Sequence, residues 1–200
     1  MLCQVHRYPT DLIDVVWLRD GRRLLIRPVL PQDEALTTAF FGSLPARARY
    51  ERFLAPVRDL PPALVKRFTN IDYASHLALL AETFDGGRET VVAEARYARD
   101  GRDASVAEFA VSVAEDWQRR GLASRLLAKL LARAAAAGIA RVVGETLAGN
   151  EGMLHLARKA GFTARPSPHA PGVVLLERAI APAPPNLHCG DLTDPQFVAA

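Results

Sequence analysis

Hydrophobic and polar positions change their spacing along the chain, and each spacing predicts an element. Apolar residues that alternate or run together indicate strands, and such segments cover 22–27, 74–84, 89–99, 104–113 and 139–147, with one or two closing strands within 162–180. Apolar residues at helical spacing cover 31–44, 45–54, 61–69, 122–137 and 150–159. This order of elements predicts an α+β fold, with a mixed sheet and helices on its faces.

These elements occupy residues 21–180, which are expected to form one domain. Half of the 200 residues are apolar, which is enough for one substantial core. Residues 1–20 have no clear periodicity and are interpreted as an N-terminal extension. Residues 181–200 open with Ala-Pro-Ala-Pro-Pro-Asn, which is typical of a proline-rich tail of low order.

Charge and residue usage exclude several classes of function. The net charge of +3 is spread along the chain, which argues against a nucleic-acid partner. The first residues contain no uninterrupted apolar stretch of signal length, and Arg125, Lys129 and Arg133 interrupt the later Leu/Ala-rich stretch, so neither an export signal nor a membrane span is expected. The two cysteines lie near opposite ends, which favours a reducing cytoplasm. The five histidines form no HxH or HExxH pairing, so no metal site is expected.

A loop between a strand and a helix carries the first candidate for chemistry. Within 107–123, Gln118, Gly121 and Ala123 are spaced Q-x-x-G-x-A. Glycine lets the backbone approach a ligand, and the free amides at a helix N-terminus attract an anion. Arg119 and Arg120 would add charge-assisted contacts. The segment therefore predicts a pyrophosphate site, although so short a pattern also fits a plain polar turn.

A second motif follows in the order that a known superfamily requires. Asn150-x-x-Met153 precedes Ala160-Gly161-Phe162. Together with the first motif, it resembles the GNAT superfamily of acetyl-CoA-dependent N-acetyltransferases. The resemblance covers roughly residues 18–180. It implies a mixed, mostly antiparallel central sheet of six to seven strands flanked by helices.

Upstream residues resemble one branch of that superfamily. Leu18-Arg-Asp-Gly-Arg, Ile26-Arg-Pro and Tyr50-x-Arg52-Phe53 are similar to the bacterial enzymes that acetylate protein lysines, notably on acyl-CoA synthetases. By this resemblance, the backbone around Val111 and Val113 pairs with the pantetheine arm of acetyl-CoA, and the loop from Gln118 holds its pyrophosphate. The implied donor-binding residues are Val111, Val113, Gln118, Arg119, Arg120, Gly121, Leu122, Ala123, Ser124, Asn150 and Met153.

The chemistry requires a base, because a lysine ammonium with a pKa of about 10.4 must lose a proton before it attacks an acyl group. Glu108 lies on the expected central strand and matches the position of the general base in the lysine-acetylating branch. It is the leading catalytic candidate. The alternative is a solvated glutamate on a half-exposed strand.

Hairpin register suggests a partner for Glu108. If the turn Asp100-Gly101-Arg102 is a three-residue loop centred on Gly101, Glu94 lies directly opposite Glu108, with Cβ atoms about 5 Å apart. Two carboxylates that close would raise the pKa of one of them. Glu94 is therefore a second catalytic candidate, which would tune Glu108 or position the amine.

One position departs from the superfamily pattern. Many members carry a tyrosine four residues before the Gly-Phe pair, where it protonates the departing thiolate, but this chain has Ala157 there. The general acid is therefore open between Ser112, His155 and water. The acceptor is expected to be a protein lysine, on an acyl-CoA synthetase for example, or else a small amine. A domain that only senses acyl-CoA is a further alternative, and both monomer and homodimer remain open.

Overall fold

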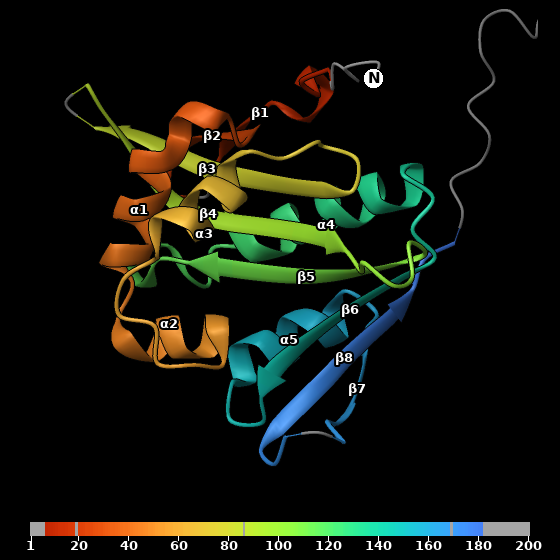
Figure 1. The fold of residues 1–200 in the computed structure, drawn as a ribbon. Helices are drawn as coiled ribbons and strands as arrows, with labels where there is room; N and C mark the ends of the chain where they lie inside the picture. Colours follow the sequence, from red (N-terminus) through yellow and green to blue (C-terminus); the bar gives the residue numbers. More distant parts are fainter. Residues whose placement is uncertain (1–6, 19, 86, 169, 182–200) are drawn as a thin grey trace, which may run out of the picture.

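One mixed sheet forms the centre of the protein and carries helices on both faces (Figure 1). The computed structural model describes residues 7–18, 20–85, 87–168 and 170–181. Its eight strands run in the order β1-β2-β3-β4-β5-β6-β8-β7, and every neighbouring pair is antiparallel except β5 and β6. The strands are β1 (Asp14–Trp17), β2 (Arg23–Pro28), β3 (His76–Asp85), β4 (Arg88–Arg99), β5 (Val106–Val113), β6 (Arg141–Leu147), β7 (Thr163–Pro166) and β8 (Val173–Ala179).

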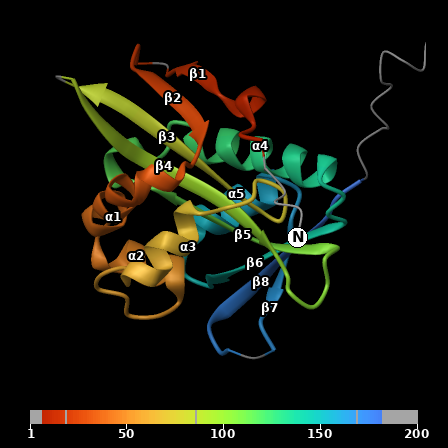
Figure 2. The same ribbon diagram turned by 45° about the horizontal axis from the view of Figure 1, so that its top comes forward.

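The helices divide between the two faces of this sheet, as both views show (Figures 1 and 2). The first three lie together on one face and the last two on the other. They are α1 (Glu34–Ser43), α2 (Ala46–Phe53), α3 (Pro62–Thr69), α4 (Leu122–Ala136) and α5 (Glu151–Lys159), and short 3₁₀ helices span Thr10–Leu12, Pro31–Asp33 and Glu115–Trp117.

Helix α4 illustrates how the sequence pattern becomes a packed element. Leu122, Leu126 and Leu130 lie on one face at helical spacing, and all three are buried in the larger core between α4 and the sheet. The helix is followed by Gly138, whose φ of 74° is a conformation that glycine adopts without steric cost. The sequence therefore sets both the buried face and the end of this helix.

A smaller core occupies the opposite face. Phe40 and Phe41 of α1 pack there with Phe68 of α3, against Leu80 of β3. The α1–α3 segment is thus anchored to the sheet by its aromatic residues. Helix α2 has no fully buried residue and lies over β5 and β6.

The sheet is larger than predicted. It has eight strands, whereas six to seven were expected. Both closing strands form, and β1, which lies in the segment interpreted as an N-terminal extension, pairs with β2. Strand β1 is short, and only Val16 of its four residues is buried, so its hydrophobic signal is weak. Of the predicted tail, residues 182–200 lie outside the described residues.

The predicted register between β4 and β5 is wrong. Glu94 pairs with Ser112, and Glu108 pairs with Ala98. The connection is longer than a three-residue turn because Asp100 Oδ1 accepts hydrogen bonds from the amides of Arg102 and Asp103, at 2.6 and 3.1 Å. The two glutamates share a face but are offset by four strand positions, which is about 13 Å.

Candidate active site

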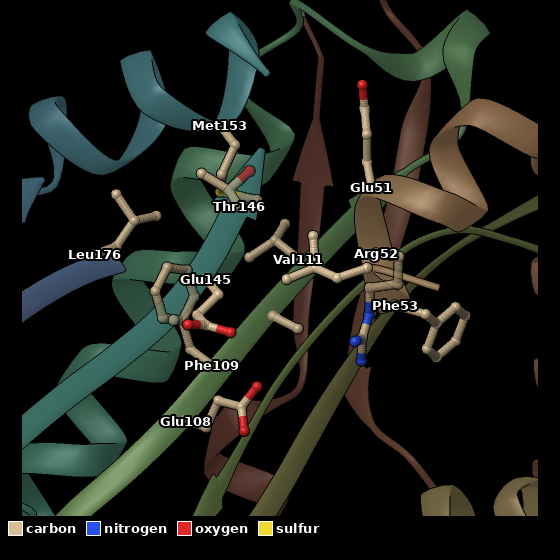
Figure 3. Close-up of a pocket in the computed structure, with 13 residues that line it drawn as sticks. Glu51, Arg52, Phe53, Glu108, Phe109, Val111, Glu145, Thr146, Met153 and Leu176 are labelled. Atoms are coloured by element: carbon tan, nitrogen blue, oxygen red, sulfur yellow. The ribbon is translucent and has the colours of Figure 1, made fainter. Parts of the chain in front are cut away.

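A split in the sheet creates the cavity that we call the main cavity, because the candidate base Glu108 lines it. Strands β5 and β6 pair in parallel only from Val106 to Glu108, and beyond that point they separate. A cavity of about 220 Å³ opens in the gap. The lining residues come from α2, β5, β6, α5 and β8: Glu51, Arg52, Phe53, Leu54, Glu108, Phe109, Ala110, Val111, Gly144, Glu145, Thr146, Met153 and Leu176 (Figure 3).

The walls of the split are closely packed. The ring of Phe109 lies 4.8 Å from that of Phe162, between their centroids. A Cβ atom added to Gly144 would lie only 2.6 Å from Phe109 Cε1. Glycine at this position therefore lets the Phe109 ring lie against β6 where the strands diverge.

Two carboxylates converge on the cavity. Glu108 is exposed on β5, and Glu145 is exposed on β6; their side chains point into the same space (Figure 3). The Glu145 carboxylate also accepts a hydrogen bond of 3.2 Å from Ser167 Oγ. Glu51 lines the cavity too, but its carboxylate points away from these two and pairs with Arg47 on α2. The site therefore presents negative charge to a cationic amine.

Glu145 is a candidate that the sequence analysis missed. Val143 pairs with Glu108 across the parallel strands. Since side chains alternate along a strand, Glu145 shares the face of Glu108. Alternation in 139–147 would have placed Glu145 on one face of its strand, but the choice of partner strand was needed to bring it beside Glu108.

Glu94 lies apart from this pair. It is only 2% exposed, and one of its carboxylate oxygens accepts a hydrogen bond from the Arg96 guanidinium. Within the described chain, no residue donates a hydrogen bond to its other oxygen, Oε2. The direct pairing with Glu108 that motivated the tuning hypothesis is absent, so Glu94 would act at most through longer-range charge.

The predicted pyrophosphate loop lies exposed between β5 and α4. Gln118 Nε2 donates to the carbonyl of Val113 at 3.1 Å, which ties the loop to the end of β5. Arg119 and Gly121 both have left-handed backbone conformations, with φ of 57° and 80°. Gly121 is the N-cap residue of α4 and supplies no side-chain cap, so the first amides of the helix remain available to an anion.

The arginines of this loop border a second cavity. It has a volume of about 340 Å³ and is lined by Leu18, Asp20, Arg119, Arg120 and Gly121. Arg120 forms an ion pair with Asp20, which also pairs with Arg22 at 2.7 Å. In this structure Arg120 is therefore bound to the β1–β2 connection rather than free in the loop.

The first residues of α4 divide into packing and exposed roles. Leu122 is buried, and Ala123 packs against the larger core, so these two would meet a ligand through their backbone only. Ser124 is half-buried. On β5, Val111 is buried beside the cavity, and Val113 packs against the core.

The second predicted motif opens helix α5. Asn150 is the N-cap residue, and its Oδ1 accepts a hydrogen bond of 3.0 Å from the amide of Met153. Met153 lines the main cavity. Ala157 is buried in the core, and His155 is exposed and does not line the cavity. Ser112 lies on β5 opposite Glu94.

The described residues form neither a candidate metal site nor a helix that could span a membrane. No group of three or more His, Cys, Asp or Glu side chains in that part of the chain is placed to hold a metal ion. Helices long and apolar enough to cross a membrane are also absent from the described ranges.

Known proteins resemble this chain over most of its length. It is 31% identical over 151 residues to acetyltransferase PA5475 of Pseudomonas aeruginosa, covering 76% of this chain and 81% of that protein. It is 32% identical over 146 residues to acetyltransferase Pat of Mycolicibacterium smegmatis; this match covers 73% of this chain but only 43% of that protein. The solved GNAT domain of S. lividans PAT superimposes with a TM-score of 0.77 and 34% identity, covering 86% of this chain and 99% of that domain.

The family assignment rests on these relatives and on a match to the sequence model of the family. Residues 44–162 match the acetyltransferase (GNAT) family, a range that includes the predicted pyrophosphate loop, the split between β5 and β6, and Asn150. Enzymes of this family use acetyl-CoA as acyl donor. The fold, the match and the relatives agree, and the chain belongs to the GNAT acetyltransferase family.

Proposed function

We propose that this protein transfers an acetyl group from acetyl-CoA to the side-chain amine of a protein lysine, with Glu108 as general base. The observation that carries the proposal is the exposed Glu108 carboxylate on β5, located where the central strands separate and facing the main cavity. A base at the split would lie beside any donor held between the strands.

Glu108 and Glu145 would have different roles toward the acceptor amine. A lysine ammonium is protonated at neutral pH, since its pKa is about 10.4. Glu108 and Glu145 would attract the ammonium into the cavity, and Glu108 would accept its proton as the neutral amine attacks. Acetyl-CoA supplies an activated thioester. Ala157 carries no proton to give and is buried, so the departing sulfur must receive its proton from another group.

Several features support acetyl-CoA as the donor. Beyond Glu108, the edge of β5 that faces β6 has no strand partner in the described chain, which suits an extended arm bearing amides. The buried Thr146 Oγ1 lines the same gap and lacks a hydrogen-bond partner among the described residues. The uncapped N-terminus of α4 and the loop from Gln118 to Gly121 suit a pyrophosphate.

The acceptor class rests on the relatives and on the resemblance. Two of the matched proteins are named Pat, and the upstream motifs resemble the branch that acetylates lysines on acyl-CoA synthetases. A small primary amine is the second candidate, because the carboxylates of Glu108 and Glu145 border one cavity of about 220 Å³. That cavity suits a small cation as well as a lysine side chain.

Release of free CoA thiol tests the proposal. The protein is incubated with acetyl-CoA and either an acyl-CoA synthetase or a panel of small amines, and products are identified by mass spectrometry. Release that depends on the synthetase, with acetyl-lysine in the product, supports the proposal. Release only with small amines assigns the second candidate function. Acetyl-CoA binding without release on any acceptor would favour a sensor.

A further inference from the structure

Arg52 differs from the other arginines of α2 in having no polar partner within the described part of the chain. Arg47 pairs with Glu51, and Arg49 donates to the carbonyls of Leu44 and Val57. By contrast, no hydrogen bond or ion pair joins the Arg52 guanidinium to any residue that the structure describes. Its position on the cavity wall is therefore not explained by a structural ion pair.

The surroundings of Arg52 hold its side chain in place. Its guanidinium carbon lies 5.0 Å from the ring centroid of Phe53, 5.8 Å from that of Phe68 and 6.0 Å from that of Phe41. Such cation–π contacts stabilise the charge without using the N–H groups. Arg52 is half-buried, and its nitrogen atoms are not fully buried, so they reach solvent in the cavity. The aromatic rings thus hold the guanidinium while its five N–H donors remain available to a ligand.

The charges around Arg52 leave room for an additional anion. Burial lowers the pKa of Arg52 to about 10; the charges of Glu94 and Glu108 oppose this lowering, and the charge of Arg96 adds to it. Among the described residues, Glu94 forms an ion pair with Arg96 and none with Arg52. In the cavity, the guanidinium of Arg52 and the carboxylate of Glu108 extend toward the same space (Figure 3). The cavity therefore has a negative side at Glu108 and Glu145 and a positive side at Arg52.

We propose that Arg52 binds a carboxylate of the acceptor, next to the amine that Glu108 deprotonates. This inference rests on the proposed acetyltransferase function and narrows its substrate class to amines with a carboxylate nearby. An arginine fork matches a carboxylate with two parallel hydrogen bonds. The carboxylate would belong to an acidic residue beside the target lysine, or to the amine itself if the acceptor is a free amino acid.

Matched acceptors test the proposal. Two peptides differ only in the residue next to a single lysine, which is glutamate in one and glutamine in the other; a free amino acid and its amide form a second pair. The variants are Arg52→Gln and Arg52→Lys. The control is Arg58→Gln, which removes the same charge from an exposed position in the loop between α2 and α3, outside the cavity. Melting temperatures of all variants check that the Phe cluster still folds around position 52.

For the wild type, we expect kcat/KM to be about tenfold higher for the carboxylate member of one pair, equivalent to about 1.4 kcal/mol. The pair that shows the preference identifies the source of the carboxylate. Arg52→Gln should erase this preference, Arg52→Lys should retain part of it, and Arg58→Gln should retain all of it. A wild type without any preference, or an Arg52→Gln variant that slows both members of a pair equally, would overturn the proposal.

The test separates this inference from the proposed function. Turnover of the glutamine peptide by wild type measures acetyl transfer without the carboxylate. If that peptide is acetylated but no preference is found, only the role of Arg52 fails. If the wild type acetylates none of the four acceptors, the proposed function fails, and the role of Arg52 fails with it.

Discussion

Replacing Gly144 with alanine tests the packing that shapes the split between β5 and β6. The new Cβ would lie 2.6 Å from Phe109 Cε1, 2.9 Å from Phe109 Cδ1 and 3.2 Å from the Phe109 carbonyl oxygen. Non-bonded carbon atoms prefer separations of about 3.5–4.0 Å, so the ring must move by about 1 Å. Phe162 lies against that ring, with 4.8 Å between the centroids, which restricts the movement.

Two opposing energies set the size of the effect. Overpacking of a core costs about 1–3 kcal/mol, while replacing glycine in a strand interior gains about 0.5–1 kcal/mol. The midpoints of these two ranges give an expected net loss of about 1.3 kcal/mol. A protein of this size loses about 2–4 °C in melting temperature per kcal/mol, which gives a decrease of about 3–5 °C.

Thermal unfolding of a small set of variants checks this value. Gly42→Ala is the matched control, since Gly42 lies in α1 and a Cβ added there would have no atom within 4 Å; its melting temperature should rise slightly. In a Phe109→Leu background, Gly144→Ala should cost clearly less, because the smaller side chain leaves space. An unchanged or increased melting temperature for Gly144→Ala would refute the reasoning.

Two further predictions concern polar groups away from the cavity. Asp33→Ala should lower the free energy of unfolding by about 1.5–3 kcal/mol in urea titrations, because the Asp33 carboxylate binds the partly buried Arg27 at 2.6 and 3.0 Å, while Arg27 keeps Glu82 and Glu89 as partners; a loss below about 0.5 kcal/mol would show that these bonds are unimportant. Burial and the neighbouring Arg96 lower the pKa of His76 to about 4, from 6.5 in the unfolded chain. The unfolded state therefore binds more protons between these values, so wild-type stability should fall as pH decreases from about 6.5 to about 4, and His76→Gln should reduce that slope; an identical slope in both proteins would contradict the assignment.

Local signals carried most of the fold prediction. Helix α4 was predictable because its apolar residues repeat at helical spacing and Gly138 follows its end. The position of the loop that carries Gln118 and Gly121, between a strand and a helix, was also predictable, and its binding of a pyrophosphate stays a prediction. In both cases, the residues that allow the prediction lie close together in the sequence.

Features that depend on side chains bonding to the backbone or on distant elements were not predictable. The β4–β5 register depends on Asp100, whose carboxylate lengthens the loop by binding two amides. Glu145 faces Glu108 only because β6 pairs in parallel with β5. In the sequence, Arg52 stood out only as part of the motif Tyr50-x-Arg52-Phe53, and its position on the cavity wall required α2 to lie over the cavity.

The most direct test of the central claim is the acetylation rate of Glu108→Gln as a function of pH, with Glu34→Gln in the exposed first turn of α1 as control. At neutral pH, the account predicts at least a tenfold loss of kcat/KM, about 1.4 kcal/mol, with unchanged affinity for acetyl-CoA. The loss should shrink toward pH 10, where much of the lysine amine is already neutral and needs no base. A variant with wild-type activity at neutral pH, or with the same loss at every pH, would contradict the assignment of Glu108 as general base.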